Sequence, residues 1–417
     1  MIVHKFGGAS VKSAEAVKNL EKIVRSFSRN MLVVISAMGK TTNALEIVVS
    51  NYFKGSGKSD QKIQEIKDYH YSIMHELFQN QENQVFSEVN ALFTGLGLIL
   101  NEQPTDNYDF EYDKIVSFGE LISSYIISAW LNECGLSNSL VDARKCLFTD
   151  NIYRDARVLL DHTQKTVTEQ FSFRNVNLYV TQGFIGSDLA GHTTTLGREG
   201  SDYSASILAY LLNAEKVMIW KDVKGIFNID PRLNDNPWKL DEISYQEAIE
   251  LAYYGAKVIH PKTIKPLQNK SIPLYVKSFL EPLEQGTIIY ETDRLPKLIP
   301  VFIFKKNQLL ISISPKDFSF IAEDNLSRIF ALFAEYHMKT NMMQNSAISF
   351  SVCLDYDERK SPLLLKELQK DFRVLYNNNV ELITIRHYND EAINDAVGNK
   401  AVLLEQKSRH TVQYVVK

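Results

Sequence analysis

Apolar and polar positions follow two alternating patterns along the first two thirds of the chain. Short runs rich in apolar residues predict strands over residues 2–6, 31–35, 140–142, 177–181, 215–220 and 272–276, and the run 31–35 is wholly apolar. Runs with helical spacing lie between them, at residues 13–27, about 52–113, 203–212 and 244–255. Apolar strands that alternate with helices are typical of an α/β fold with a mainly parallel sheet.

The pattern changes beyond residue 286. From about residue 300 it predicts strand 309–313, helix 322–338, a strand pair around 340–354, helix 362–372 and strand 380–387. A short helix over 390–397 and a hairpin over 400–417, turning at residues 408–409, follow. We therefore predict two domains, 1–295 with a helical insertion at about 52–113, and a smaller α+β domain, 300–417.

A long polar connection lies between the strand that ends at Thr181 and the helix that begins near Asp202. It carries five glycines, three consecutive threonines (residues 193–195) and Arg198. Glycine allows the backbone to approach a ligand, helix N-termini bind anions, and arginine matches a carboxylate or phosphate. The structural alternative is a long surface loop with Asp202 as the helix cap.

Other glycine motifs are less specific. Gly7 and Gly8 follow the first strand directly, which is typical either of a phosphate cradle, with Lys5 beside it, or of an ordinary tight turn. Residues 39–41 resemble the end of a P-loop, but Val34 occupies the position where that motif needs glycine. Residues 117–120 form a capping box that gives Glu120 a structural role as plausible as a functional one.

Composition narrows the functional classes. A length of 417 residues suggests two or three domains, and a net charge of −4 does not favour nucleic acid as a partner. We expect no membrane span and no signal peptide, because no apolar run is long enough and strand-like sequence begins within two residues of Met1. Three widely spaced cysteines predict neither a disulfide framework nor a metal site, and the expected location is the cytoplasm.

Six motifs together resemble the aspartokinases, members of the amino-acid kinase superfamily. They occur in the family's order within residues 1–290, and they are Lys5-Phe6-Gly7-Gly8, Ser117-Phe118-Gly119-Glu120, Thr193-Thr194-Thr195-Leu196-Gly197-Arg198, Gly200-Ser201-Asp202-Tyr203, Asp230-Pro231-Arg232 and Gly255-Ala256-Lys257-Val258. The resemblance implies a mainly parallel sheet sandwiched by helices, followed by ACT-like (ferredoxin-like) regulatory units. It also implies phosphorylation of the L-aspartate side-chain carboxylate by ATP with Mg²⁺, the first step of lysine, threonine and methionine biosynthesis.

The resemblance further implies a role for each matching residue. Lys5 would stabilise charge on the transferred phosphoryl group, and Asp202 would orient the catalytic lysines. Arg198 would bind a carboxylate of aspartate and Glu120 its ammonium group, with Ser36, Thr42 and Ser201 completing the pocket. The nucleotide would contact Lys5, Gly7, Gly8, Lys221, Asp222, Phe227, Arg232 and Lys257. No carboxylate-rich motif suggests a dedicated metal site, so the nucleotide's own oxygens would hold Mg²⁺.

Some positions depart from the family pattern. Ala9 stands where threonine is frequent, Glu199 where glycine is usual, Lys221 where threonine is common and Phe227 where tyrosine is common. We expect Glu199 either to turn outward or to weaken substrate affinity. None of these changes removes a charge that the reaction requires.

The C-terminal region also departs from the pattern. Its second ACT-like unit, from about residue 372, lacks a last helix and strand. Feedback lysine or threonine would bind at Asn341, Gln344, Asn345 and Ser346, or these are ordinary turn residues, and we expect a homodimer or larger homo-oligomer. The alternatives to aspartate kinase are a kinase for glutamate or carbamate and a non-catalytic amino-acid sensor. Intact Lys5, Arg198, Asp202 and Lys257 argue against a sensor.

Overall fold

The computed structural model describes residues 1–417 except 235, 257–258, 293–298 and 318. The chain divides into two compact units, each described by itself below. The first comprises residues 1–226, 240–249 and 258–294, and the second comprises residues 227–239, 250–257 and 295–417. The second unit therefore includes two short segments from within the predicted domain 1–295.

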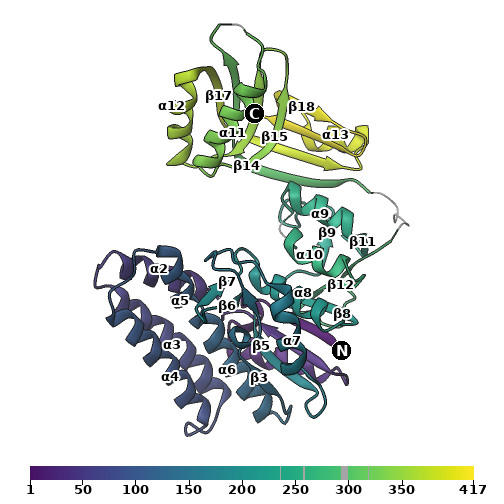
Figure 1. Cartoon of the computed structure of the whole chain (residues 1–417). Coiled ribbons are helices and arrows are strands. Elements are labelled where there is room, and N and C mark those ends of the chain that lie inside the picture. The colour runs from purple at the N-terminus through teal and green to yellow at the C-terminus, as the bar shows by residue number, and fades with distance from the viewer. Residues whose placement is uncertain (235, 257–258, 293–298, 318) are drawn as a thin grey trace. The chain divides into compact units, whose positions relative to one another are not determined.

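An eight-stranded sheet forms the centre of the first unit (Figure 1). Its strands in spatial order are β11 (Glu242–Ser244), β13 (Thr287–Tyr290), β12 (Leu274–Ser278), β8 (Lys216–Lys221), β1 (Ile2–Phe6), β2 (Met31–Ile35), β5 (Leu178–Gln182) and β3 (Ser139–Val141). All neighbours are parallel except β12 and β13. This confirms the predicted mainly parallel sheet, whose central strands β1, β2 and β5 are buried along their whole length.

Helices cover both faces of this sheet. One face carries Phe6, Val33, Ile35 and Trp220, which share a core with α1, α3, α4 and α6. Lys5 points to the other face, since side chains alternate along a strand, and α8 packs there on β1, β2 and β8. The helices of the first unit are α1 (Ala14–Arg25), α2 (Thr41–Phe53), α3 (Ser59–Leu77), α4 (Gln84–Asn101), α5 (Tyr108–Val116), α6 (Phe118–Glu133), α7 (Leu160–Gln170), α8 (Gly200–Leu211), the start of α9 (Tyr245–Tyr254) and α10 (Pro261–Gln268).

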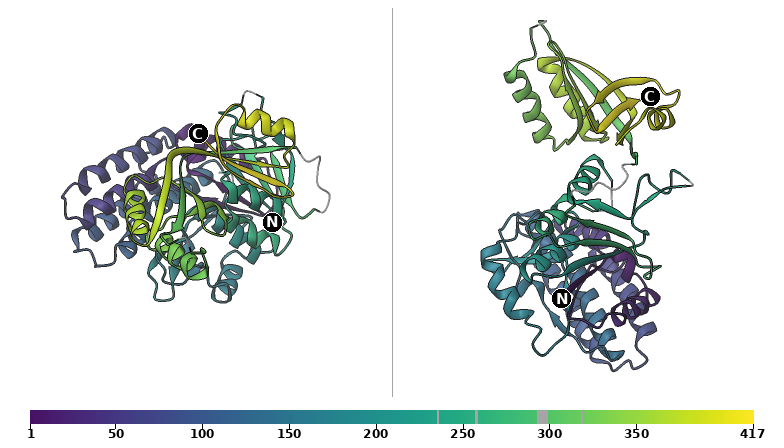
Figure 2. Two further views of the ribbon diagram at one scale, coloured as in Figure 1. Left: turned by 90° about the horizontal axis from the view of Figure 1, so that it is seen from above. Right: turned by 90° about the vertical axis from the view of Figure 1, so that its right-hand side faces the viewer.

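The predicted helical insertion consists of α3, α4 and α5, and α3 packs on α2 and α4 (Figure 2). The combined stretch Tyr108–Glu133 is long and apolar enough to cross a membrane, with a mean hydropathy of 1.2. However, 78% of the 18-residue segment that gives this hydropathy is buried inside the protein, as expected of helices that pack in a core.

The long connection after β5 is not an irregular loop, and that alternative was wrong. It contains β6 (Ile185–Asp188) and β7 (Thr193–Thr195), which form a small sheet with β4 (Phe148–Thr149) in the order β4-β6-β7. Gly186 lies against Leu147, where a Cβ atom would approach the Leu147 carbonyl oxygen to 2.6 Å. The packed threonines of β7 therefore bring Arg198 and α8 to a fixed place.

The second unit contains a six-stranded antiparallel sheet. Its strands in spatial order are β15 (Thr340–Asn345), β16 (Phe350–Asp355), β14 (Val301–Pro315), β17 (Phe372–Arg386), β19 (Thr411–Val416) and β18 (Val402–Lys407). Helices α11 (Glu323–Glu335) and α12 (Lys360–Asp371) pack together, and α13 (Asp390–Val397) packs on β17. The two-stranded sheet of β9 (Ile226–Phe227) and β10 (Lys239–Leu240) precedes this region in sequence.

Strands β14 and β17 run through both halves of this sheet, of which one contains β15 and β16 and the other contains β18 and β19. Residues 308–313 of β14 pair with β16, whereas residues 301–305 pair with residues 382–386 of β17. The half that contains β18 and β19 therefore has four strands, because the start of β14 contributes one of them. One described helix, α13, accompanies these four strands.

Candidate active site

A cavity of about 550 Å³ opens at the carboxyl ends of β1, β2 and β8 in the first unit. In parallel α/β sheets, ligands bind at this edge because strand ends and helix N-termini converge there. The predicted site residues that line the cavity are Lys5, Gly7, Gly8, Ser36, Thr42, Glu120, Arg198, Ser201, Asp202, Lys221 and Asp222. The structure therefore brings together residues from segments separated by up to 217 positions in the sequence.

A buried ion-pair triad of Lys5, Asp202 and Lys221 lines the cavity. The Nζ atom of Lys5 lies 2.6 Å from Oδ1 of Asp202, and the Nζ atom of Lys221 lies 3.3 Å from Oδ2. Burial alone would raise the pKa of Asp202, but Lys5 and Lys221 outweigh it and hold the pKa below its usual value. Asp202 is thus an ionised anchor for two ammonium groups. Its interpretation as a helix cap was wrong, since Glu199 precedes the first residue of α8.

The glycine turn after β1 lies beside this triad. A Cβ atom on Gly8 would stand 2.8 Å from the Ala37 carbonyl oxygen and 2.9 Å from that of Gly39, so the loop after β2 packs directly on this backbone. On Gly7 a Cβ atom would lie 3.5 Å from the Nζ atom of Lys5. The short helix η1 (Gly8–Val11) begins here, which places backbone N–H groups next to two cations. This arrangement suits a polyphosphate.

Glu120 is a second buried carboxyl group that lines the cavity. Its Oε1 atom accepts a hydrogen bond from the backbone N–H of Ala37 at 3.2 Å. Its Oε2 atom is shielded from solvent and has no hydrogen-bond partner among the described residues. Burial raises the pKa of Glu120 to about 8, although the Ala37 N–H and the charge of Lys5 act against this shift. A buried carboxylate with an open acceptor is suited to a cationic ligand group.

Ser117 does not cap α6, so the capping-box interpretation of residues 117–120 was wrong. Ser117 has helical angles, φ −56° and ψ −23°, and makes no side-chain cap hydrogen bond. Its hydroxyl instead donates to the carbonyl oxygen of Lys114 at 3.1 Å. The carboxylate of Glu120 is therefore available to the cavity.

The segment that carries Arg198 has an unusual backbone. Gly197 has φ 75°, and a Cβ atom there would meet Oδ1 of Asp155 at 2.5 Å. Glu199 also lies in the left-handed region, with φ 54°, which costs a non-glycine residue about 1–2 kcal/mol. Its Oε2 atom is shielded from solvent and has no partner among the residues that the structure describes. Glu199 lines the cavity beside Arg198, so it does not turn outward as one expectation had it.

Asp113 connects two walls of the cavity, and no sequence motif identified it. This buried carboxylate accepts hydrogen bonds from the backbone N–H of Thr195 at 2.7 Å and from its hydroxyl at 2.6 Å. It also accepts the N–H of Arg154 at 3.0 Å, and Arg154 and Tyr112 both line the cavity. The guanidinium of Arg154 lies 4.4 Å from the Tyr112 ring centroid. These residues lie in or beside the helical insertion, where nothing in the local pattern distinguishes them.

Two predicted nucleotide contacts, Phe227 and Arg232, do not line the described cavity, and a third lies outside the described residues. Phe227 and Arg232 belong to the second unit, where the Nη2 atom of Arg232 lies 2.6 Å from Oδ2 of Asp230. Lys257 lies outside the described residues. The proposed roles of these three residues stay predictions.

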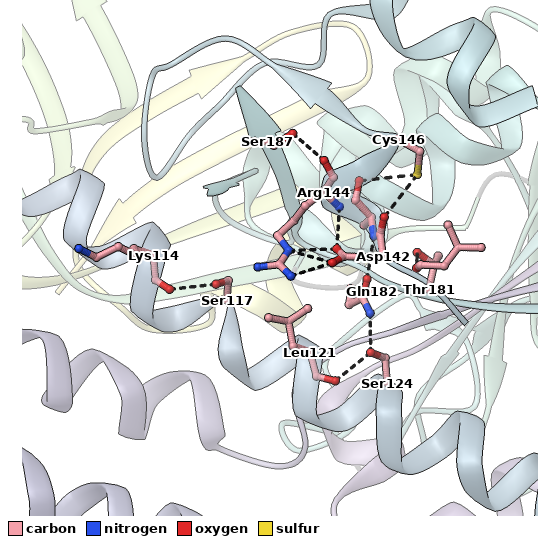
Figure 3. Close-up of polar contacts among 12 residues, drawn as sticks. Lys114, Ser117, Leu121, Ser124, Asp142, Arg144, Cys146, Thr181, Gln182 and Ser187 are labelled. Atoms are coloured by element: carbon pink, nitrogen blue, oxygen red, sulfur yellow. Dashed lines mark hydrogen bonds and ion pairs between the residues drawn. The ribbon is translucent and has the colours of Figure 1, made fainter. Parts of the chain in front are cut away.

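A second polar cluster lies at the carboxyl ends of β3 and β5, and its polar atoms bind one another (Figure 3). Arg144 forms a bidentate ion pair with Asp142, with Nε–Oδ1 at 3.0 Å and Nη2–Oδ2 at 2.7 Å. Gln182 donates to the Ser124 hydroxyl at 2.6 Å and accepts the N–H of Ala143 at 2.8 Å. This cluster holds the sheet edge together, whereas Glu120 and Glu199 each retain an open acceptor.

Comparisons with known proteins give one family. The family model described as "Amino acid kinase family" matches residues 1–278. The lysine-sensitive aspartokinase 3 of Escherichia coli (strain K12) is 30% identical over 393 residues, covering 92% of this chain and 86% of that protein. The aspartokinase of Chlamydia pneumoniae is 30% identical over 351 residues, covering 84% and 77%.

Solved structures give a similar result. The structure of E. coli aspartokinase III in complex with lysine and aspartate matches with a TM-score of 0.85 and 28% identity, covering 100% of this chain and 96% of that one. The same enzyme in complex with aspartate and ADP matches with a TM-score of 0.84, also at 28% identity. A Clostridium acetobutylicum aspartate kinase, at 23% identity and a TM-score of 0.80, shares the fold.

Proposed function

The chain belongs to the aspartokinases of the amino acid kinase family, and on this premise we propose that it phosphorylates the side-chain carboxylate of L-aspartate with ATP. The products would be 4-phospho-L-aspartate and ADP, and the reaction would be the first step of lysine, threonine and methionine biosynthesis. One observation carries the proposal: a single cavity is lined both by two lysines ion-paired with Asp202 and by the buried carboxyl group of Glu120, which has an open oxygen.

The pair of lysines, Lys5 and Lys221, is suited to the phosphoryl donor. Reaction requires a carboxylate to approach a phosphorus atom surrounded by negative oxygens, so positive charge and in-line positioning supply most of the catalysis. Lys5 and Lys221 provide that charge, and Asp202 holds both ammonium groups in place before ligands bind. Gly7 and Gly8 expose backbone donors to the phosphates. No protein base is needed, because the attacking aspartate carboxylate is already ionised at neutral pH.

Glu120 and Arg198 are suited to the amino-acid acceptor. Glu120 would bind the α-ammonium group, and Arg198 the α-carboxylate, through its planar fork. Ser36, Thr42 and Ser201 also line the cavity and would position the side-chain carboxylate for attack. A zwitterion held at both charges presents its third charge to the phosphates in one orientation.

Mg²⁺ would reach the site with the nucleotide. Among the described residues there is no group of three or more His, Cys, Asp or Glu side chains that could hold a metal ion. Asp222 lines the cavity next to Lys221 and is the carboxylate placed to contact a cation between phosphates. When bound, the ion would neutralise charge on the phosphate oxygens.

Feedback by lysine or threonine, and assembly into a homo-oligomer, remain proposals for the second unit. Asn341, one of the four predicted effector residues, donates to Gln308 at 2.8 Å and to Asp355 at 2.9 Å, and accepts from Lys305 at 2.9 Å. Its amide is therefore engaged within the sheet. Ser346 bonds to Ser349 at the turn between β15 and β16. An effector in this region would rely on Gln344 and Asn345, which are exposed.

The test is turnover with Mg-ATP and L-aspartate, with the acyl phosphate trapped by hydroxylamine. We expect hydroxamate from aspartate in the wild-type protein and a loss of signal in Lys5→Ala. Glutamate and carbamate serve as competing acceptors. Hydroxamate from glutamate alone would assign the other acceptor, and no product from any acceptor would favour a sensor. Titrating turnover with lysine and with threonine tests feedback. If neither amino acid inhibits the reaction, the feedback hypothesis is contradicted.

A further inference from the structure

Glu199 is the residue of the cavity that the proposed reaction leaves without a role. The family resemblance places glycine at this position, and the left-handed φ of 54° explains why glycine suits it. The chain nevertheless keeps a glutamate there, with one carboxylate oxygen shielded from solvent. A side chain that occupies an unfavourable backbone conformation and a shielded position invites a search for what it binds.

The backbone around Glu199 is well anchored. Its carbonyl oxygen accepts the N–H groups of Asp202 at 3.0 Å and Tyr203 at 3.1 Å, which start helix α8. The side chain is thereby attached to the same helix turn that carries the catalytic carboxylate.

The chemistry of the open oxygen excludes most parts of the two substrates. A carboxylate oxygen only accepts hydrogen bonds or binds cations, so phosphates and carboxylates are repelled. The remaining candidates are the α-ammonium group of the amino acid and the Mg²⁺ that accompanies ATP.

Position distinguishes these two candidates. Glu199 follows Arg198, the proposed partner of the α-carboxylate, and an amino acid carries its ammonium and α-carboxylate on the same carbon. The proposed phosphate contacts instead gather around Gly7, Gly8 and Lys221, where Asp222 supplies a carboxylate. An ammonium group has three N–H donors, and Glu120 offers it one open oxygen.

We propose that Glu199 is a second acceptor for the α-ammonium group of the substrate, so that Glu120 and Glu199 grip it together. This inference rests on the proposed aspartate kinase function and deepens it. Two carboxylates would select strongly for acceptors with a free amino group. Glu199 would then replace the glycine of related enzymes at a cost in backbone strain and a gain in acceptor selectivity.

The test compares L-aspartate with succinate, which has both carboxylates but no amino group. Wild type, Glu199→Gln and Glu199→Gly are assayed for KM and kcat with aspartate, for Ki with succinate, and for the Mg²⁺ requirement. We expect both variants to raise KM for aspartate about tenfold, with kcat within about twofold. Ki for succinate should stay unchanged or fall, because a repelling carboxylate is gone. Glu169→Gln, an exposed glutamate of α7, is the matched control.

Two results would overturn the inference. A lower KM for aspartate in either variant would mean that Glu199 repels the substrate. An unchanged preference for aspartate over succinate, with or without a raised Mg²⁺ requirement, would mean that Glu199 does not bind the ammonium group. Circular dichroism confirms that the variants fold, and Glu199→Gly keeps the test valid if the glutamine strains the turn. Absence of hydroxamate in the wild type would instead contradict the proposed function itself.

Discussion

Two buried carboxyl groups that line the cavity, Asp202 and Glu120, are used in opposite ways. Asp202 is buried with two lysines beside it, and its pKa lies below the usual value. Glu120 is equally buried, yet one oxygen has no partner among the described residues, and burial raises its pKa to about 8. Each oxygen of Asp202 therefore has a lysine as its ion-pair partner, whereas Glu120 has an oxygen without a partner among the described residues.

This difference separates a catalytic device from a binding device. Around Asp202 the charges are arranged before any ligand arrives, so little reorganisation is needed during reaction. At Glu120 the ligand-free protein leaves a buried carboxyl group incompletely paired, and burial favours its protonated form until a cation stabilises the ionised one. The lysine cluster should control turnover, whereas Glu120 should control affinity and stability. The following experiments test this division, from the largest expected effect to the smallest.

Removing the positive charge of Lys5 should have the largest effect on turnover. Lys5→Met keeps the length of the side chain but not its charge, and we expect kcat to fall by about 10³-fold, or about 4 kcal/mol. KM for aspartate should change much less. Steady-state kinetics measure both, and Lys165→Met, an exposed lysine on α7, is the control. A kcat within tenfold of wild type would contradict the role of Lys5.

Replacing Glu120 should separate affinity from stability. Glu120→Gln removes the ionisable group, so KM for aspartate should rise by about 10²-fold. Above pH 8, where the ionised form of Glu120 is buried at a cost, the free energy of unfolding should increase by about 1–3 kcal/mol. Chemical denaturation and steady-state kinetics measure the two effects. Loss of both affinity and stability would show that Glu120 is a structural residue.

The raised pKa of Glu120 predicts a pH dependence. Because the folded-state pKa of about 8 lies above the unfolded value, the protonated form contributes stability below about pH 4.5, and this contribution is lost as pH rises through 8. The free energy of unfolding of the ligand-free protein should therefore fall over this window by up to about 1.4 kcal/mol per pH unit, relative to Glu120→Gln. Aspartate should bind more tightly as pH rises. Parallel pH profiles of the two proteins would contradict the assignment.

Asp113 should influence affinity from a distance. Asp113→Asn places an NH₂ group against the N–H donors of Thr195 or Arg154, and we expect a loss of about 1–3 kcal/mol in unfolding free energy. KM for aspartate should rise several-fold, because β7 positions Arg198. Thermal denaturation and kinetics on the same preparation test whether both changes occur. An unchanged KM would limit Asp113 to a structural role.

The smallest effect concerns backbone strain. Glu199→Gly relieves the left-handed conformation and should stabilise the first unit by about 1 kcal/mol, visible as a slightly higher melting temperature in calorimetry. Gly197→Ala is the opposing control, because its φ of 75° and its contact with Asp155 leave no room for a side chain. A lower melting temperature in Glu199→Gly would show that the glutamate stabilises the fold.

The sequence by itself determined the parts of this protein that depend on local pattern. The apolar runs of β1, β2, β5 and β8 and the helical periodicity around them predicted the parallel sheet, since strand and helix periods differ along any chain. The motifs that resemble those of the aspartokinases also pointed to Lys5, Glu120, Arg198 and Asp202, which line one cavity in the structure. Residues 185–195 were missed as strands because β6 and β7 are short and depend on β4 for pairing.

Only the tertiary structure decided which charges are satisfied. Ser117 and Glu120 fit the sequence pattern of a capping box, and α5 continues almost directly into α6, so Ser117 stays helical and Glu120 turns to the cavity. Asp113 and Arg154 carry no motif, and their hydrogen bonds join segments 41 residues apart. Burial and partners at such distances depend on how elements pack, and local sequence does not encode them.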